Sequence, residues 1–169
     1  NWSKRLLSKL ELDADLLAPC FESEEVTGQL RPDVAKKLGL TTDCVVVGGA
    51  GDCAANAVGT GIVKQGLLAS SLGTSGVMFV HSDEMQFDPA GRLHTFCHAV
   101  RGKWHMMGVS LSAAGSLEWF CQTLCQQLTK RNGGTDPYEV LNREAQAVPT
   151  GSEGLFFLPY LAGERTPHS

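Results

Sequence analysis

The sequence Cys-Val-Val-Val-Gly-Gly-Ala-Gly-Asp, which spans residues 44–52, decides the fold class of this chain. Its four leading residues are apolar and are bounded by turn-forming residues, a pattern typical of a strand buried on both faces of a parallel sheet. A glycine loop follows, and we expect Asp52 to be the N-cap of a helix of small residues that extends to Gly61. Strand, loop and helix in this order indicate an α/β fold, in which ligands bind beyond the carboxyl ends of strands.

The pattern of predicted secondary structure changes near residue 64. Before that point we expect helices at residues 2–12 and 34–38, with a loop at 13–25 between them and Gly39 as the C-terminal cap of the second helix. After it, a β-hairpin opens a new region. The predicted elements there are strands 67–71, 77–80, 94–100, 104–109 and 155–158, and helices 112–128 and 136–148. We therefore place a boundary between a domain at 1–64 and a domain at 65–169.

Composition and charge exclude several classes of protein. The 169 residues carry a net charge of −4, and the longest basic run is Lys130-Arg131, so the chain lacks the basic footprint of a nucleic-acid-binding protein. No apolar run approaches the roughly 20 residues of a membrane span. The six cysteines form no Cys-x-x-Cys pair, which favours reduced thiols in a cytoplasmic protein. The chain starts at Asn1 without an initiator Met and stops abruptly, so we expect a piece of a longer protein.

Asp52 has two interpretations. At the end of a strand, beside a loop without bulky side chains, its carboxylate could accept the proton of a substrate hydroxyl that attacks phosphorus. Capping the following helix is the alternative, and because this is one of the commonest roles of Asp, the spacing alone favours it. The loop is not a dinucleotide-binding loop, because Gly-x-Gly-x-x-Gly is absent from it.

The turn Leu-Gly-Thr-Ser-Gly at residues 72–76 is a second candidate. Gly73 permits close approach of a ligand to the backbone, and the hydroxyls of Thr74 and Ser75 can donate hydrogen bonds to phosphate oxygens. A plain hairpin turn has the same composition, so both interpretations stand. The turn is neither a Walker A loop nor a nucleophile elbow, because the sequence patterns of both are absent.

Two further groups of polar residues are weaker candidates. His94, Cys97 and His98 carry metal-ligating atoms, but on a strand Cys97 points to the face opposite both histidines, so packing is favoured and no metal site is predicted. Glu164 and Arg165 lie in a polar loop, where they either reach a ligand or hold the loop in place.

Five motifs in register resemble the FGGY carbohydrate kinase family, and the resemblance covers nearly the whole chain. They are Gly-Gly-Ala-Gly-Asp-Cys-Ala-Ala at 48–55, Ser-Leu-Gly-Thr-Ser-Gly-Val at 71–77, Phe-Cys-His-Ala at 96–99, Trp-His at 104–105 with Ser-Leu-Ser-Ala-Ala at 110–114, and Phe-Leu-Pro-Tyr-Leu at 157–161 with Pro-His at 167–168. The step of 20 residues from Asp52 to Leu72 also fits the family. Each motif alone is short, whereas five in the right order are specific.

The resemblance implies a fold and an activity. The fold is ribonuclease-H-like α/β, as in the actin, hexokinase and Hsp70 superfamily, with the end of a sugar-binding first domain and the start of a nucleotide-binding second domain. The activity is ATP-dependent phosphorylation of a ketose, foremost D-xylulose to xylulose 5-phosphate, with ATP as co-substrate and Mg²⁺ neutralising its phosphates. Asp52 is then the catalytic base, Asp52 and Cys53 bind the sugar, and Gly73, Thr74 and Ser75 contact the ATP phosphates.

The chain departs from the family pattern in two respects. Family members often carry Asn directly after the catalytic Asp, where this chain has Cys53, so the identity of the sugar is open. The family's N-terminal hairpin with a metal-associated aspartate and its C-terminal adenosine motif are absent, so we expect the segment alone to be inactive.

The alternative functions are a kinase of another sugar or polyol and a non-catalytic ATP switch of the actin or Hsp70 type. The expected partners are small molecules, with neither nucleic acid nor membrane, and a homodimer is left open.

Overall fold

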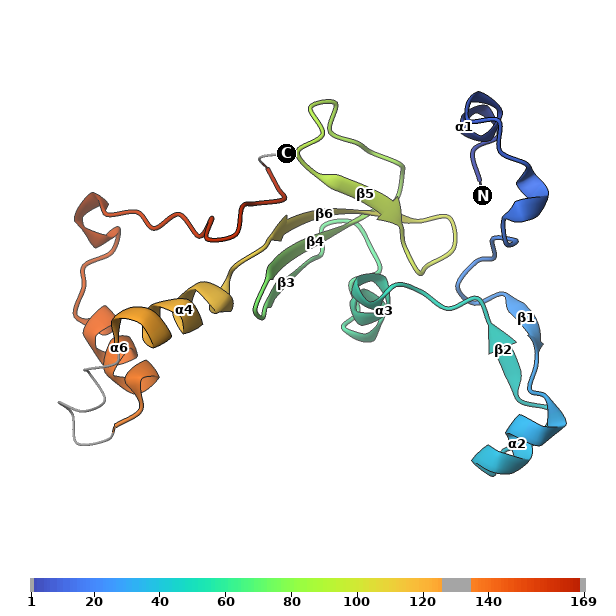
Figure 1. Ribbon diagram of the computed structural model, residues 1–169, viewed down its shortest axis with the longest axis horizontal. Helices are drawn as coiled ribbons and strands as arrows, with labels where there is room; N and C mark the ends of the chain where they lie inside the picture. Colours follow the sequence, from blue (N-terminus) through green and yellow to red (C-terminus); the bar gives the residue numbers. More distant parts are fainter. Residues whose placement is uncertain (1, 126–134, 168–169) are drawn as a thin grey trace. The chain divides into compact units, whose positions relative to one another are not determined.

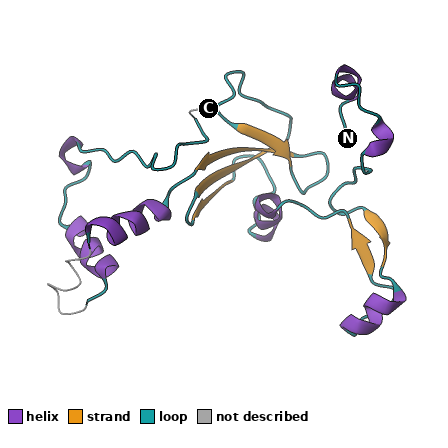
Figure 2. Ribbon diagram, viewed as in Figure 1, coloured by secondary structure: helices purple, strands orange, loops and turns teal. Residues whose placement is uncertain are grey.

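The computed structural model describes residues 2–125 and 135–167, which form short helices, strands and connecting loops (Figure 1, Figure 2). The elements in chain order are α1 (Lys4–Lys9), the 3-10 helix η1 (Ala14–Leu16), β1 (Val26–Gln29), α2 (Pro32–Leu38), β2 (Val45–Val47), α3 (Asp52–Gly59), β3 (Leu68–Leu72), β4 (Gly76–Ser82), β5 (His94–Cys97), β6 (Trp104–Ser110), α4 (Ala114–Leu124), α6 (Pro137–Gln146) and the 3-10 helix η2 (Ser152–Gly154). The predicted helix end at Leu128 and the motif residue His168 lie outside the described residues.

The chain forms two compact units, and each is described by itself. The first comprises Asn1–Leu67, His81–Gln86 and Phe96–His105, and the second comprises Leu68–Val80, Phe87–Thr95 and Met106–Ser169. Small residues make up the buried apolar positions of the first unit, which are Ala35, Ala54 and Ala57. Larger side chains are buried in the second unit, namely Phe79, Val109, Cys121, Cys125 and Val140.

The strand predicted at residues 44–47 is present in the first unit as β2, but it is exposed. It pairs antiparallel with β1, a strand that the sequence did not predict, in a two-stranded sheet. The three valines of β2 are 49%, 41% and 45% exposed. The prediction of a strand buried in a parallel sheet is therefore wrong for the described residues. Burial on both faces requires a layer packed against each face, and β1 covers only one edge of β2.

The predicted glycine cap of one helix is confirmed, and a second helix begins within one residue of its predicted start. α2 begins with Pro32 and ends at Leu38, and Gly39 caps it in the left-handed conformation with φ of +68° that glycine favours at a helix C-terminus. α6 begins after Asp136, whose carboxylate accepts a hydrogen bond of 3.0 Å from the Tyr138 amide. Both signals are local, which explains why the sequence predicts them well.

The predicted β-hairpin is confirmed as β3 and β4, which pair antiparallel from Leu68 opposite Val80 to Leu72 opposite Gly76. They belong to a four-stranded sheet in the order β3-β4-β6-β5 (Figure 1). β5 ends at Cys97 rather than at residue 100, because the chain turns where the Val100 amide donates to Nδ1 of His98 at 3.0 Å. The turn at residues 73–75 connects the two strands of the hairpin.

The strand predicted at residues 155–158 is absent. These four residues have no regular secondary structure, and their side chains are 81%, 86%, 57% and 65% exposed. A strand needs a neighbouring strand edge to pair its backbone groups, and within the described ranges no strand pairs with this segment. The apolar run alone therefore gave a wrong prediction.

Candidate functional site

The glycine loop before Asp52 is held against residues 22–25 of the first unit. The Gly48 amide donates to the Glu25 carbonyl at 3.0 Å, and the Gly49 amide donates to the Ser23 carbonyl at 2.9 Å. A methyl group at Gly48 would overlap the Glu22 carbonyl oxygen, so the close approach requires glycine. Gly49 has a φ of +74°, which glycine adopts without strain. The loop is therefore fixed by its backbone.

Asp52 is the first residue of α3 rather than its N-cap, because Gly51 takes the N-cap position with extended dihedral angles. The predicted N-cap is wrong by one residue. Oδ1 of Asp52 accepts a hydrogen bond of 2.8 Å from the Cys53 amide, so the carboxylate still binds an orphan amide of the helix. The side chain is exposed, and it also forms a side-chain hydrogen bond with the Cys53 thiol. Cys53 thus orients the carboxylate, which remains exposed to a ligand.

Cys53 lies beside this carboxylate and is half-buried. Burial raises the pKa of the Cys53 thiol, and the neighbouring charge of Asp52 raises it further. The side chain therefore remains a neutral thiol at physiological pH, a weak hydrogen-bonding group that does not compete with Asp52 for a proton.

The turn at residues 73–75 is fixed by the start of α4 in the second unit. The Ala113 and Gly115 amides donate to the Thr74 carbonyl at 2.8 and 3.2 Å, and the Ala114 amide donates to the Gly73 carbonyl at 2.9 Å. α4 has no side-chain cap, so these turn carbonyls satisfy amides that a helix start leaves unpaired.

Glycine at position 115 permits this close contact, because a Cβ there would lie 3.1 Å from both the carbonyl oxygen and Cγ2 of Thr74. Gly73, Thr74 and Ser75 are all exposed. The Thr74 hydroxyl has no hydrogen-bond partner among residues 2–125 and 135–167, whereas the Ser75 hydroxyl donates to the Leu111 carbonyl at 3.4 Å. The turn thus combines a rigid backbone with an accessible hydroxyl.

The sequence prediction named these five residues, and the structure places them in two groups. Asp52 and Cys53 are adjacent at the start of α3 in the first unit. Gly73, Thr74 and Ser75 share one turn in the second unit. The contacts of the turn with residues 111–115 were not predicted, although the motif at 110–114 marked that segment as notable.

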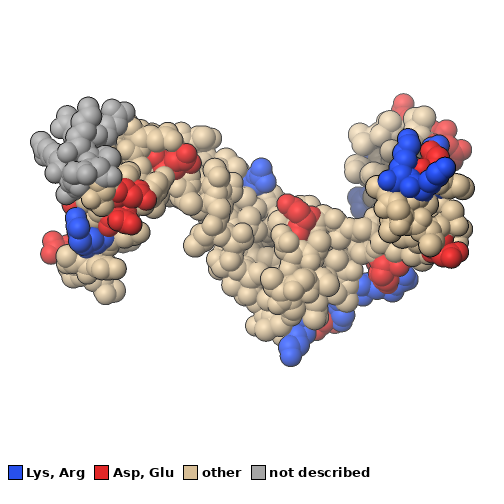
Figure 3. Space-filling model, turned by 90° about the horizontal axis from the view of Figure 1, so that it is seen from below, with Lys and Arg blue, Asp and Glu red and all other residues tan. Residues whose placement is uncertain are grey.

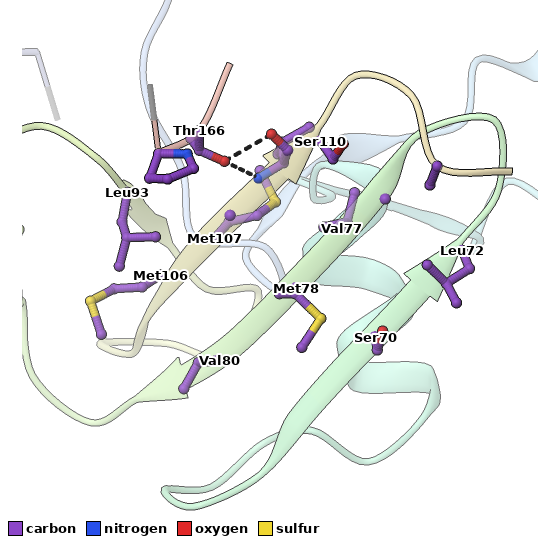
Figure 4. A pocket seen from close by; sticks show the side chains of 15 residues that line it. Ser70, Leu72, Val77, Met78, Val80, Leu93, Met106, Met107, Ser110 and Thr166 are labelled. Atoms are coloured by element: carbon purple, nitrogen blue, oxygen red, sulfur yellow. Dashed lines mark hydrogen bonds between the residues drawn. The ribbon is translucent and has the colours of Figure 1, made fainter. Parts of the chain in front are cut away.

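Residues 164–166 are joined to the end of β6. Oε1 of Glu164 accepts from the Leu111 amide at 2.9 Å and from the Arg165 amide at 2.8 Å, while Oε2 accepts from the Ser110 hydroxyl at 3.0 Å. The buried hydroxyl of Thr166 donates to the Val109 carbonyl at 2.8 Å and accepts from the Val109 amide (Figure 4). Of the two roles considered for Glu164, these contacts support holding the loop.

A pocket of about 540 Å³ lies on one face of the sheet in the second unit, beside Thr166 (Figure 4). Its walls are mainly apolar and include Met78, Val80, Leu93 and Met106. None of its lining residues is charged, so the pocket offers no Arg or Lys to pair with a phosphate.

The histidines of the first unit form a buried cluster. His98 accepts from the Val100 amide through Nδ1 and donates from Nε2 to the Ile62 carbonyl at 3.0 Å, so its ring is used structurally. The rings of His81 and His105 lie 5.0 and 6.0 Å from the ring of His98. Burial lowers the pKa of His98, and burial with the nearby His98 lowers the pKa of His105 to about 4. The participation of His81 was not predicted, because its position in the sequence carries no metal or catalytic pattern.

Some charged side chains of the described residues form ion pairs across short distances. Arg101 pairs with Glu24, Lys103 with Asp83, and Arg92 with Asp88. Figure 3 shows lysines and arginines in small groups close to acidic residues on the face displayed. In the described ranges, no three side chains of His, Cys, Asp or Glu lie together as a metal site, and no helix is long and apolar enough to cross a membrane.

Comparisons with known proteins give one consistent family. Family models described as the N-terminal and C-terminal domains of the FGGY family of carbohydrate kinases match residues 1–59 and 68–169. The chain is 43% identical to a xylulose kinase of Klebsiella pneumoniae over 169 residues, which are 100% of this chain and 33% of that protein. It is 33% identical to a gluconokinase of Bacillus subtilis over 172 residues, covering 99% of this chain and 33% of the relative.

Solved structures show the same likeness. A xylulose kinase from Brucella ovis matches with a TM-score of 0.79 and 43% identity, covering 99% of this chain and 32% of that chain. A ligand-bound xylulose kinase from Lactobacillus acidophilus matches with a TM-score of 0.84 and 28% identity, with coverages of 99% and 32%. The chain spans about a third of the length of the relatives it matches. These neighbours confirm the predicted ribonuclease-H-like α/β fold.

Proposed function

Because the chain belongs to the FGGY family of carbohydrate kinases, we propose that its protein phosphorylates D-xylulose with ATP, giving xylulose 5-phosphate and ADP. The observation that carries this proposal is the 43% identity to a xylulose kinase along the whole chain. A kinase of another sugar is the second candidate, and the 33% identity to a gluconokinase favours it.

Asp52 is the proposed catalytic base. A sugar hydroxyl oxygen attacks the γ-phosphorus of ATP, the bond from that phosphorus to the β–γ bridging oxygen breaks, and the hydroxyl proton passes to Asp52. The exposure of the Asp52 carboxylate at the start of α3 supports this role. The hydrogen bond from the Cys53 amide to Oδ1 holds the carboxylate in one orientation. In the proposal Cys53 borders the sugar and contributes to the choice of substrate.

Gly73, Thr74 and Ser75 are proposed to contact the ATP phosphates. The turn is exposed, its backbone is fixed by three amides at the start of α4, and the Thr74 hydroxyl is accessible. A fixed donor costs less to align with an anion than a mobile one, so a rigid turn is suited to bind phosphate.

The remaining parts of the proposal concern Mg²⁺, partners, location and domains. Mg²⁺ is included as the cation that ATP brings, but the described residues offer no three-ligand site for it, and no step is assigned to it.

The partners are the sugar and ATP, and a homodimer is left to measurement. Six free thiols support a reducing, cytoplasmic location. A boundary between residues 64 and 65 falls between the two family matches, which end at 59 and begin at 68.

The substitution Asp52→Asn in the full-length protein tests the proposal. Asn keeps the shape of the side chain, and its Oδ1 can accept the same hydrogen bond from the Cys53 amide, so the melting temperature should stay near that of the wild type. The loss of a general base should lower kcat by ~10²–10⁴ in a coupled assay of ADP release with xylulose.

Asp43→Asn is the matched control, because Asp43 is an exposed carboxylate in a turn of the same unit. A near-normal kcat for Asp52→Asn would mean that Asp52 has only a structural role at the start of α3, and would contradict the proposed mechanism. A sugar-independent release of ADP by the wild type would instead indicate an ATP switch. Comparing kcat/KM for xylulose and gluconate would decide between the two candidate substrates.

A further inference from the structure

Glu164 lies far along the chain from the turn at residues 73–75, yet short contacts within the second unit connect them. Its carboxylate is half-buried and accepts hydrogen bonds from the Leu111 amide at 2.9 Å and from the Ser110 hydroxyl at 3.0 Å. Both donors belong to the segment that leads from β6 into α4. The carboxylate therefore fixes this segment at its start.

The same segment holds the turn from its other end. The Leu111 carbonyl accepts from the Ser75 hydroxyl at 3.4 Å, so Leu111 contacts Glu164 through its amide and the turn through its carbonyl. Two residues later, the amides of residues 113–115 donate to the carbonyls of Gly73 and Thr74 at 2.8 to 3.2 Å. A displacement of Leu111 would thus be transmitted directly to the turn.

The charge of Glu164 makes this connection strong. Hydrogen bonds to an ionised carboxylate are shorter and about twice as strong as bonds between neutral groups, and partial burial strengthens them further. α4 has no side-chain cap of its own, so the position of its first amides depends on the segment before it and on the turn carbonyls.

We propose that Glu164 is a positioning residue for ATP: by holding Ser110 and Leu111, its carboxylate fixes the backbone of the turn at residues 73–75 in the geometry that binds phosphate. The inference rests on the proposed kinase function. It predicts an effect on the affinity for ATP, whereas a residue that merely stabilised the fold would affect both substrates or neither.

The test compares Glu164→Gln, Ser110→Ala and the double variant in the full-length protein. Glu144→Gln is the control, because Glu144 is an exposed carboxylate on α6 of the same unit. KM values for ATP and for xylulose are measured separately, together with kcat and the melting temperature.

Glu164→Gln should raise the KM for ATP roughly tenfold, the effect of losing one hydrogen bond to a charged group, and should leave the KM for xylulose within about twofold. Ser110→Ala should raise the KM for ATP by a smaller factor. The double variant should resemble Glu164→Gln, because the Ser110 hydroxyl acts through the same carboxylate.

A KM for ATP within about twofold of the wild type in Glu164→Gln, or an equal rise in both KM values, would overturn the proposal. If Glu164→Gln does not fold, Ser110→Ala tests the proposal instead. An unchanged KM for ATP in Ser110→Ala would overturn the proposal, and a rise in the KM for ATP alone would support it. A wild-type protein that releases no ADP with any sugar would overturn the proposed function and this inference together. An active wild type with an unresponsive Glu164→Gln would refute only the positioning role.

Discussion

Adding one methyl group to the glycine loop should destabilise the first unit measurably. In Gly48→Ala, the new Cβ would overlap the Glu22 carbonyl oxygen and would lie 3.3 Å from Cβ of Phe21. The loop cannot simply move away, because the Gly48 amide donates to the Glu25 carbonyl at 3.0 Å and the Gly49 amide donates to the Ser23 carbonyl at 2.9 Å. The clash is with backbone, which yields less readily than the end of a flexible side chain.

The expected loss of stability is the sum of two destabilising effects and one stabilising effect. Overpacking by a methyl group costs about 1–3 kcal/mol, and loss of the Gly48–Glu25 hydrogen bond would cost about 0.5–1.5 kcal/mol. Alanine loses less conformational entropy on folding than glycine, which returns about 0.4–1 kcal/mol. We therefore expect Gly48→Ala to destabilise the unit by about 2 kcal/mol.

Gly59→Ala is the matched control, because a Cβ at Gly59 meets no atom within 4 Å and Gly59 lies in α3 of the same unit, where alanine is favoured. Amide hydrogen exchange of the full-length protein, followed at residues 45–49, measures the local stability without requiring a two-state transition. A loss of 2 kcal/mol corresponds to roughly 30-fold faster exchange. If Gly48→Ala exchanged no faster than Gly59→Ala, the close packing of the loop against residues 22–25 would be refuted.

Three further substitutions in the full-length protein test other parts of the structure. Thr74→Val removes an exposed hydroxyl at nearly constant volume, so the KM for ATP should rise roughly tenfold or more while the KM for sugar stays constant; an effect on the sugar alone would contradict the phosphate role. Cys53→Asn replaces a half-buried thiol by a stronger hydrogen-bonding group, so the ratio of kcat/KM for xylulose over ribulose should rise, and an unchanged ratio would mean that Cys53 only packs. Burial and the nearby His98 lower the pKa of His105 from 6.5 to about 4. The unfolded chain therefore binds a proton at His105 at higher pH than the folded chain does. The contribution of neutral His105 to folding stability is complete above pH 6.5 and is lost as the pH falls towards 4. In His105→Gln the melting temperature should fall less between pH 7 and pH 4 than in the wild type. An equal fall in both proteins would show that other groups cause the acid sensitivity.

The sequence determined the features whose causes lie within a few residues. The glycine cap after α2 was predicted from local residues, because it follows from the dihedral freedom of glycine. The predicted start of α6 is correct to within one residue, and the structure adds that Asp136 is its cap. The hairpin of β3 and β4 follows from two short apolar runs separated by turn residues. The order of five motifs also indicated the family correctly.

Predictions of burial failed where a local pattern was taken to imply packing. Three consecutive valines form a strand in β2, but whether its faces are covered depends on other segments, and β2 is exposed. The apolar run at residues 155–158 has strand propensity and no strand partner among the described residues. Propensity is a property of the run itself, whereas pairing and burial are properties of its neighbours.

Only the tertiary structure decided how the candidate site is supported. Asp52, Thr74 and their neighbours were named from the sequence, but the amides of residues 113–115 that hold the turn, and Glu164 that holds Leu111, lie about 40 and 90 residues away from Thr74. No local spacing encodes these contacts, because the chain must fold before its distant backbone groups can meet. The sequence therefore predicted which residues carry the chemistry, and the fold decided which residues hold them in place.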